Sequence, residues 1–125
     1  MPEPAVQKIL IVDDEPDVTF LLRTYLENDG FDVDTCSNGG EALDLIGFGN
    51  YKLVIMDYFL PLLKGDTVCQ SVRSEGRFND LPIIIMTGFV DKSEEFFKDK
   101  GATEVLYKPV RQAELVSRVK HYLAP

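Results

Sequence analysis

Four short apolar runs in this sequence are each followed at once by residues whose side chains could do chemistry. The runs 8–12, 53–56, 83–86 and 105–107 lead into Asp13 and Asp14, Asp57, Thr87, and Lys108. If the runs are neighbouring strands of one parallel sheet, these side chains meet at the carboxyl edge of the sheet, where sheets of this class bind their ligands. Three carboxylates, a hydroxyl and an ammonium group in one place suit the binding of a divalent metal and the handling of a phosphoryl group.

The elements that would position these residues alternate regularly along the chain. Short apolar runs separated by helix-like segments are typical of buried parallel strands that helices cover on both faces. We expect strands at 8–12, 31–36, 53–56, 83–86 and 104–107. We expect a first helix that begins at 15–17 and stops at 28–30, then helices over 41–46, 66–74, 91–100 and 112–123. Gly30 suits a left-handed helix ending, and either Asp91 or Ser93 can cap the 91–100 helix.

This alternation predicts an α/β fold, a doubly wound five-stranded parallel sheet with five helices of the flavodoxin-like class. A barrel requires eight such units and about 250 residues, whereas this chain has 125. Right-handed crossovers with one switch point give the strand order 2-1-3-4-5. That order places side by side the four strands that lead into the marked residues. We therefore expect one domain over residues 1–125.

The composition narrows the class of protein. A hydrophobic content of 45% and a charged content of 27% are those of a soluble globular protein. No apolar run approaches the about 20 residues of a membrane-spanning helix, and the N-terminus lacks a signal-peptide pattern, so we expect a cytoplasmic protein. A net charge of −8 and a pI near 4.5 argue against direct binding to nucleic acid or to an anionic membrane.

Cysteine and histidine chemistry is not expected. Cys36 and Cys69 have no C-x-x-C spacing, and we expect both to be buried thiols in a reducing compartment. The one histidine, His121, falls in the last predicted helix, far from the strand ends. This pattern argues against a zinc site and against a serine or cysteine nucleophile paired with histidine.

Taken together, the motifs resemble those of a response-regulator receiver domain, the CheY-like phospho-acceptor module of two-component signalling. The matching segments are 9–16, 54–61 with Gly65, 84–88, and Gly101-Ala102 leading to Lys108-Pro109. The match covers essentially the whole chain in the right order and spacing. Each motif alone is weak, but the set is highly specific.

The resemblance implies a Mg²⁺ site and a phosphorylation site that share a residue. Asp57 would be the phosphoryl acceptor and also a metal ligand, Asp14 would bind the metal directly and Asp13 largely through water. The backbone carbonyl of Phe59 would complete the protein's share of ligands. A carboxylate with an ordinary pKa of about 4 is ionised at neutral pH, and we expect Asp57 to be such a nucleophile.

The resemblance also implies the remaining catalytic roles and the partners. Lys108 would pair with the phosphoryl oxygens and with Asp57, Thr87 would donate a hydrogen bond to the phosphoryl group, and the Lys108–Pro109 peptide bond would be cis. The donor would be a sensor histidine kinase or a phosphotransfer protein. The chain would not otherwise be an enzyme, catalysing only its own phosphoryl transfer and autodephosphorylation. The output would lie on the face of the fourth helix, fifth strand and fifth helix, which could also hold a second copy and carries Lys100, Arg111 and Arg118.

The sequence departs from the receiver pattern at two places. Receiver domains commonly carry an aromatic residue three positions before the lysine, where this chain has Val105, and Tyr107 cannot be assumed to replace it. The bulky residues Phe59 and Phe89 should flank the acceptor, where they would exclude the water that attacks an acyl phosphate, or would simply cover apolar surface.

Two other functions are weighed against this one. A phosphohydrolase of the haloacid-dehalogenase type also uses a strand-end aspartate and Mg²⁺, but it needs a second acid at the position that Phe59 occupies here. A pseudo-receiver that only binds partners is disfavoured by the complete acidic set. Whether the domain stands alone or belongs to a longer regulator, and which kinase serves it, stay open.

Overall fold

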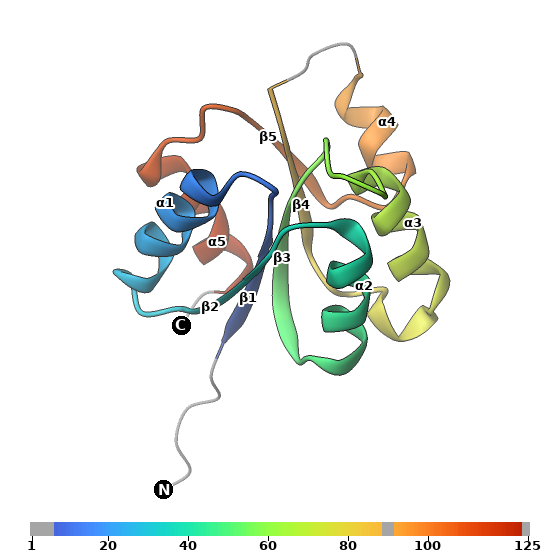
Figure 1. The fold of residues 1–125 in the computed structure, drawn as a ribbon, viewed down its shortest axis with the longest axis horizontal. Coiled ribbons are helices and arrows are strands. Elements are labelled where there is room, and N and C mark those ends of the chain that lie inside the picture. Colours follow the sequence, from blue (N-terminus) through green and yellow to red (C-terminus); the bar gives the residue numbers. More distant parts are fainter. Residues whose placement is uncertain (1–6, 89–91, 124–125) are drawn as a thin grey trace, which may run out of the picture.

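The fold is a five-stranded parallel sheet with helices on both faces (Figure 1). The computed structural model describes residues 7–88 and 92–123. The strands are β1 (Lys8–Val12), β2 (Asp32–Cys36), β3 (Tyr51–Asp57), β4 (Ile83–Thr87) and β5 (Glu104–Tyr107). The helices are α1 (Pro16–Glu27), α2 (Gly39–Phe48), α3 (Gly65–Ser74), α4 (Glu94–Asp99) and α5 (Gln112–Tyr122), with a short 3₁₀ turn η1 (Gly76–Phe78). The strand order β2-β1-β3-β4-β5 confirms the predicted topology.

The two faces of the sheet bury alternate residues of each strand. In β1, Ile9 and Ile11 belong to the core beneath α1 and α5, whereas Leu10 and Val12 belong to the core beneath α2, α3 and α4 (Figure 1). Both sets are fully buried, as expected of a parallel strand covered on both sides. The central strands therefore leave only their ends accessible, and the site must form there.

Helices α2 and α4 differ most from their predicted bounds, and for local reasons. Helix α2 starts at Gly39 and not at 41, because the side chain of Asn38 caps it by accepting a 2.8 Å hydrogen bond from the Glu41 N–H. Gly39 is required there, since a Cβ at this position would lie 2.7 Å from Val68 Cγ2 of α3. Helix α4 is shorter than the predicted 91–100, because Ser93 caps it with a 3.1 Å hydrogen bond from the Phe96 N–H. The alternative cap, Asp91, lies outside the described residues.

Two smaller expectations are confirmed, the glycine ending of α1 and the burial of both cysteines. Gly30 follows α1 with a φ of +93°, in the left-handed region that glycine tolerates. Cys36 and Cys69 are buried free thiols, and burial raises the pKa of each to about 12, which keeps them protonated and unreactive. His121 lies in α5, away from the strand ends. Within the described residues, no helix is both long enough and apolar enough to span a bilayer.

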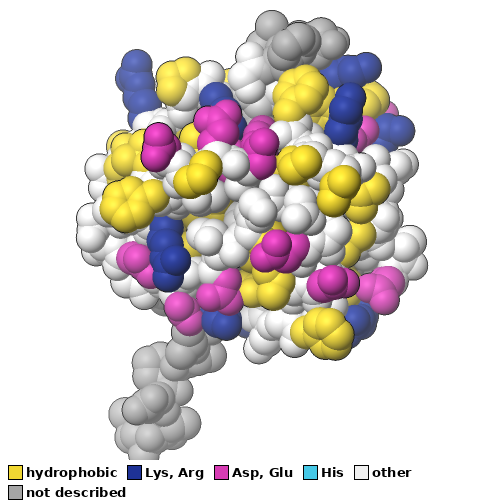
Figure 2. All heavy atoms as spheres, viewed as in Figure 1, with side chains coloured by type: hydrophobic (Ala, Val, Ile, Leu, Met, Phe, Trp, Pro, Cys, Tyr) yellow, Lys and Arg dark blue, Asp and Glu magenta, His cyan; other side chains and the backbone are white. Residues whose placement is uncertain are grey.

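The surface mixes both signs of charge. On the face shown in Figure 2, acidic and basic side chains are interspersed, and hydrophobic side chains lie singly or in small groups between them. Among the described residues, the most exposed large hydrophobic side chains are Phe48, Leu62 and Phe20. Acidic residues outnumber basic ones, 21 to 13, but they do not gather into one large field on this face.

Candidate functional site

The four marked strand ends meet at one edge of the sheet, as predicted. Asp13 directly follows β1, Asp57 ends β3, Thr87 ends β4 and Lys108 directly follows β5. The backbone N–H of Lys108 donates a 2.9 Å hydrogen bond to the carbonyl of Thr87, which extends the β4–β5 pairing up to the site. The side chains are therefore placed by the sheet itself and not by a free loop.

Three carboxylates form a cluster that could hold a cation. Ligand atoms of Asp13, Asp14 and Asp57 all lie within 4.8 Å of one another. Asp13 and Asp57 are buried, with 2% and 5% of their surface exposed, whereas Asp14 is exposed. Two buried acids beside an accessible one make a site that solvent ions can reach from one side.

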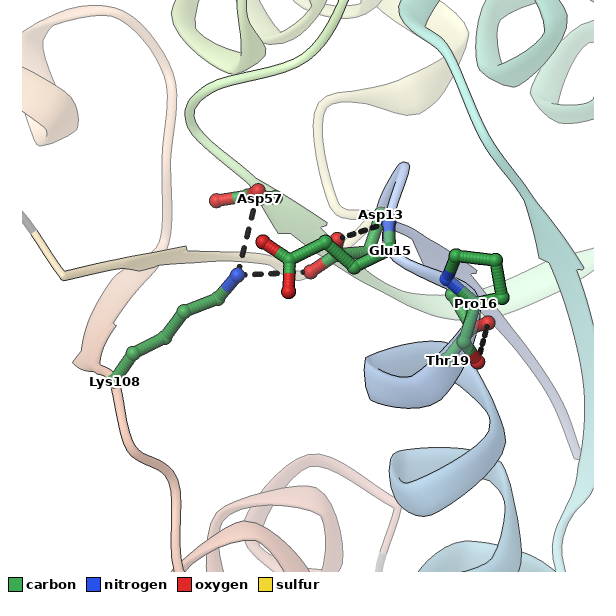
Figure 3. A network of polar contacts seen from close by, with 6 residues as sticks. All are labelled: Asp13, Glu15, Pro16, Thr19, Asp57 and Lys108. Atoms are coloured by element: carbon green, nitrogen blue, oxygen red, sulfur yellow. Dashed lines mark hydrogen bonds and ion pairs between the residues drawn. The ribbon is translucent and has the colours of Figure 1, made fainter.

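Lys108 joins the two buried acids. Its Nζ lies 2.9 Å from Asp13 Oδ2 and 3.3 Å from Asp57 Oδ2, and Figure 3 shows the side chain reaching from the end of β5 toward both. The Lys108–Pro109 peptide bond is cis, which confirms the prediction. Burial lowers the pKa of Lys108, but the hydrogen bond to Asp13 and the charge of Asp57 outweigh it and keep that pKa above its ordinary value. The ammonium therefore stays charged at any physiological pH.

Both carboxylate oxygens of Asp13 are already engaged by the protein. Oδ1 accepts a 2.9 Å hydrogen bond from the backbone N–H of Glu15, and Oδ2 accepts one from Lys108 (Figure 3). The turn that presents Glu15 is continued by the first turn of α1, where the Thr19 hydroxyl donates to the carbonyl of Pro16 at 2.9 Å. This arrangement agrees with a role for Asp13 in holding a metal through water and leaves Asp14 and Asp57 as the more available ligands.

The electrostatics of Asp57 differ from the expectation. We expected an ordinary pKa, but burial, together with the charge of Asp13, raises the pKa of Asp57 to about 6. Lys108 and a backbone hydrogen bond from Phe59 act in the opposite direction without cancelling the rise. The site thus carries more negative charge than its single ammonium balances. A divalent cation would balance this excess negative charge, and Mg²⁺ suits the site because it prefers carboxylate oxygens as ligands.

A cavity of about 450 Å³ opens onto the cluster. Its walls are formed by Asp14, Glu15, Asp57, Phe59, Gly88 and Lys108. The ring of Phe59 is 43% exposed, so it covers one side of the acceptor without sealing it. Glu15 was considered in the sequence only as part of a helix start. Its position directly after the Asp13-Asp14 pair is the signal that could have placed it in the cavity wall.

The family follows from a match that spans nearly the whole chain. Residues 9–120 match the model of the response regulator receiver domain. The chain belongs to this family of two-component signalling domains.

Similar proteins and similar solved structures agree with the assignment to this family. The chain is 35% identical over 119 residues to a transcriptional regulatory protein CpxR homolog from Haemophilus influenzae, covering 94% of this chain and 51% of the relative. It thus spans about half the length of the curated relatives it matches. A putative response regulator from Chloroflexus aurantiacus superposes with a TM-score of 0.89 at 35% identity, over 97% of this chain and 100% of that one.

A receiver-domain structure that contains a metal is also similar. The receiver domain of a sensor histidine kinase from Pseudomonas aeruginosa superposes with a TM-score of 0.87 at 25% identity, over 97% of this chain and 100% of that one. That structure holds a magnesium ion coordinated in its active-site cleft. In the present receiver domain, the cluster of Asp13, Asp14 and Asp57 provides carboxylates of the kind such an ion requires.

This receiver domain departs from the common pattern on β5, as the sequence indicated. Val105 is buried and belongs to the core beneath α2, α3 and α4. Tyr107 is 38% exposed and lies at a surface groove lined also by Pro109, Arg111 and Glu114. Thr87 is fully buried at the end of β4, in register with Tyr107. Tyr107, two residues after Val105, is on the same face of the strand, and its side chain is partly exposed while that of Val105 is buried. Phe89 lies outside the described residues.

Proposed function

We propose that this receiver domain accepts a phosphoryl group on Asp57 from the phosphohistidine of a sensor histidine kinase or phosphotransfer protein, with Mg²⁺ bound. The observation that carries the proposal is the Lys108 ammonium placed between Asp13 and Asp57, 2.9 and 3.3 Å away, beside a three-carboxylate cluster. A cytoplasmic location is part of the proposal, and the two buried free thiols support it.

The proposed reaction transfers a phosphoryl group from the histidine of the donor protein to Asp57. A carboxylate oxygen of Asp57 forms a bond to phosphorus while the bond from phosphorus to the imidazole nitrogen breaks, and its electron pair returns to the imidazole. Lys108 stays charged and pairs with the phosphoryl oxygens, and the Thr87 hydroxyl donates a hydrogen bond to one of them. Asp14, Asp57 and the Phe59 carbonyl would hold Mg²⁺, with Asp13 acting through water. When bound, Mg²⁺ neutralises charge on the carboxylates and on the phosphoryl oxygens.

The two other functions are less well supported. A haloacid-dehalogenase-type hydrolase requires an acid two residues after the nucleophile, and Phe59 stands there with its ring in the cavity wall. A pseudo-receiver would not need the complete acidic cluster with its lysine, which this chain has. We therefore propose that the chain's chemistry is limited to its own phosphorylation and dephosphorylation.

The proposed output face is α4–β5–α5. A groove of about 410 Å³ on this face is lined in part by Glu94, Tyr107 and Arg111. Arg118 forms a 2.7 Å ion pair with Glu104 within the chain, and the Lys100 ammonium lies 5.4 Å from the centre of the Phe96 ring. Of Lys100, Arg111 and Arg118, Arg111 is the one that is exposed, and it is therefore the one best placed to contact a partner or a second copy.

Incubation with acetyl phosphate and Mg²⁺ should add one phosphoryl group to the wild-type chain and none to Asp57→Asn. Removal of the metal with a chelator should abolish the labelling, because the charge on the acids would then repel the anionic donor. Intact-mass spectrometry measures both effects. A wild-type mass that does not change, or equal labelling of Asp57→Asn, would overturn the proposal.

Phosphoryl-Asp57 should be lost faster in Phe59→Asn than in the wild type, by about three- to tenfold. An apolar ring beside the acceptor excludes water, whereas an amide can hold and orient a water molecule. A positioned general base accelerates such a reaction at least about a hundredfold, and we expect a smaller acceleration because an amide does not remove a proton. The loss of label after removal of the donor measures the rate. We expect Phe89→Glu to act in the same direction, and Phe48→Asn, at an exposed ring on α2, to leave the rate unchanged. Equal lifetimes in all four proteins would show that the rings do not control water.

A further inference from the structure

A series of aromatic rings runs from the acceptor to α4. Tyr58, directly after Asp57, packs edge-on against two rings. Its ring centre lies 4.7 Å from that of Phe59 and 5.0 Å from that of Phe97 in α4. Phe97 in turn packs edge-on against Phe96 at 5.3 Å. Edge-on pairs at these distances are favourable beyond their buried area, because the positive edge of one ring meets the negative face of the next.

Tyr58 is buried, and its backbone is held by hydrogen bonds next to the acceptor. It is 5% exposed, its backbone N–H donates to the carbonyl of Met86 at 2.9 Å, and its carbonyl accepts from the N–H of Gly65 at 2.9 Å. Gly65 allows this closeness, since a Cβ there would lie 2.7 Å from the Asp57 carbonyl oxygen. Any displacement of residues 57–59 on loading of the site therefore moves the Tyr58 ring with it.

Two contacts of helix α4 bear on how it could move. Its buried residue is Phe97, which is fully enclosed and contacts Tyr58. The turn after its C-terminus is held by Arg73 of α3, whose Nε donates to the Gly101 carbonyl at 2.9 Å and whose Nη1 donates to the Phe78 carbonyl at 2.6 Å. With the far end held by Arg73, a push on Phe97 would turn the helix about its C-terminal end.

Phe96 extends the series toward the surface. Lys92 and Lys100 place their ammonium groups 4.8 and 5.4 Å from the centre of its ring. Such contacts favour one orientation of the ring and of the two cations. A rotation of α4 would therefore rearrange charged groups on the proposed output face.

We propose that the Tyr58–Phe97 ring contact couples the acceptor site to the position of α4, in place of an aromatic residue on β5. The inference rests on the proposed phosphorylation of Asp57, because the displacement starts there. Tyr58 and Phe97 are positioning residues in this account. They transmit the state of the site but take no part in the phosphoryl transfer.

Hydrogen exchange of residues 94–100, with and without Mg²⁺ and beryllium fluoride as the phosphoryl mimic, tests this coupling. In the wild type, the mimic should change exchange of these amides by about two- to tenfold, the range that one aromatic pair contributes. Tyr58→Leu and Phe97→Leu should each remove most of this response, and the double variant should lose no more than either single one. Tyr58→Phe keeps the ring and should retain the response, which separates a role of the ring from general destabilisation.

Tyr107→Leu is the matched control, because it removes the single aromatic ring of β5, which directly precedes Lys108. It should leave the α4 response intact. The proposal is overturned if the response persists in Tyr58→Leu and Phe97→Leu, if Tyr107→Leu abolishes it, or if wild-type α4 does not respond. Labelling by acetyl phosphate is measured on the same proteins. Failure to label the wild type would overturn the proposed function and this inference together, whereas normal labelling with an unchanged α4 response in the variants overturns the inference alone.

Discussion

Asp57→Asn should raise the free energy of unfolding by about 1–3 kcal/mol at neutral pH when no divalent cation is present. The folded chain holds Asp57 among buried groups and beside Asp13, and these raise its pKa to about 6. In the unfolded chain that pKa returns to about 3.9. The ionised acceptor thus opposes folding, and a neutral amide of the same shape removes the opposition.

The stabilisation by Asp57→Asn should depend on pH in a defined direction. Because the folded state has the higher pKa, the stability that protonated Asp57 contributes is fully present below about pH 4 and is lost as the pH rises through 6. The difference between Asp57→Asn and wild type should therefore grow between these two values and stay level above them. Urea unfolding at a series of pH values in the presence of a chelator measures it.

Two controls separate the acceptor from ordinary surface charge. Asp44→Asn, at an exposed position of α2, should change the free energy of unfolding by less than about 0.5 kcal/mol at any pH. Addition of Mg²⁺ should stabilise the wild type more than Asp57→Asn and so narrow the gap, because a ligand stabilises the state that binds it. An Asp57→Asn chain that is less stable than wild type in chelator at neutral pH would contradict this reading of the site.

Lys108→Met should have the opposite effect and lower the free energy of unfolding by about 2–4 kcal/mol. The ammonium contacts Asp13 and Asp57, whose side chains are 0% and 8% exposed, and methionine would fill the space without supplying the charge. Removing one partner from a buried ion pair costs about 3–5 kcal/mol. We reduce this value because the Lys108 side chain is itself 24% exposed.

The matched control for this substitution is Lys120→Met. Lys120 pairs with Asp29 at a similar distance of 2.9 Å, but its side chain is 50% exposed, so the loss should be under about 1 kcal/mol. Chemical denaturation of the two variants beside the wild type measures both losses. Equal losses would mean that the strand-end lysine is an ordinary surface ion pair and not the counter-charge of a buried site.

The strands and the site residues were predictable because their signals are local. The runs in β1, β3 and β4 are uninterrupted, apolar and too short for helices, and each ends on the residue that the sheet then presents at its edge. The exact start of α2 was not predictable in the same way. Two glycines normally disfavour a helix, and only the packing of Gly39 against α3 shows why the first of them is used.

The properties that depend on packing between distant segments were not predictable. The raised pKa of Asp57 arises from burial and from Asp13, which follows a different strand. The contact between Tyr58 and Phe97 joins the acceptor loop to a helix for which the sequence predicted only bounds and a cap. Of the two neighbouring phenylalanines of α4, Phe97 is fully buried and Phe96 is partly exposed, a difference that only the packing of the helix shows.

The central claim is that Asp57, and not another member of the acidic cluster, carries the phosphoryl group. An aspartyl phosphate is an activated acyl group, so treatment of the labelled chain with borohydride reduces the modified side chain to the alcohol of homoserine. Peptide mapping by mass spectrometry then identifies the position. We expect homoserine at position 57 alone, and only after incubation with both Mg²⁺ and the phosphodonor. Homoserine at Asp13 or Asp14, or a labelled chain with no reduced aspartate, would contradict it.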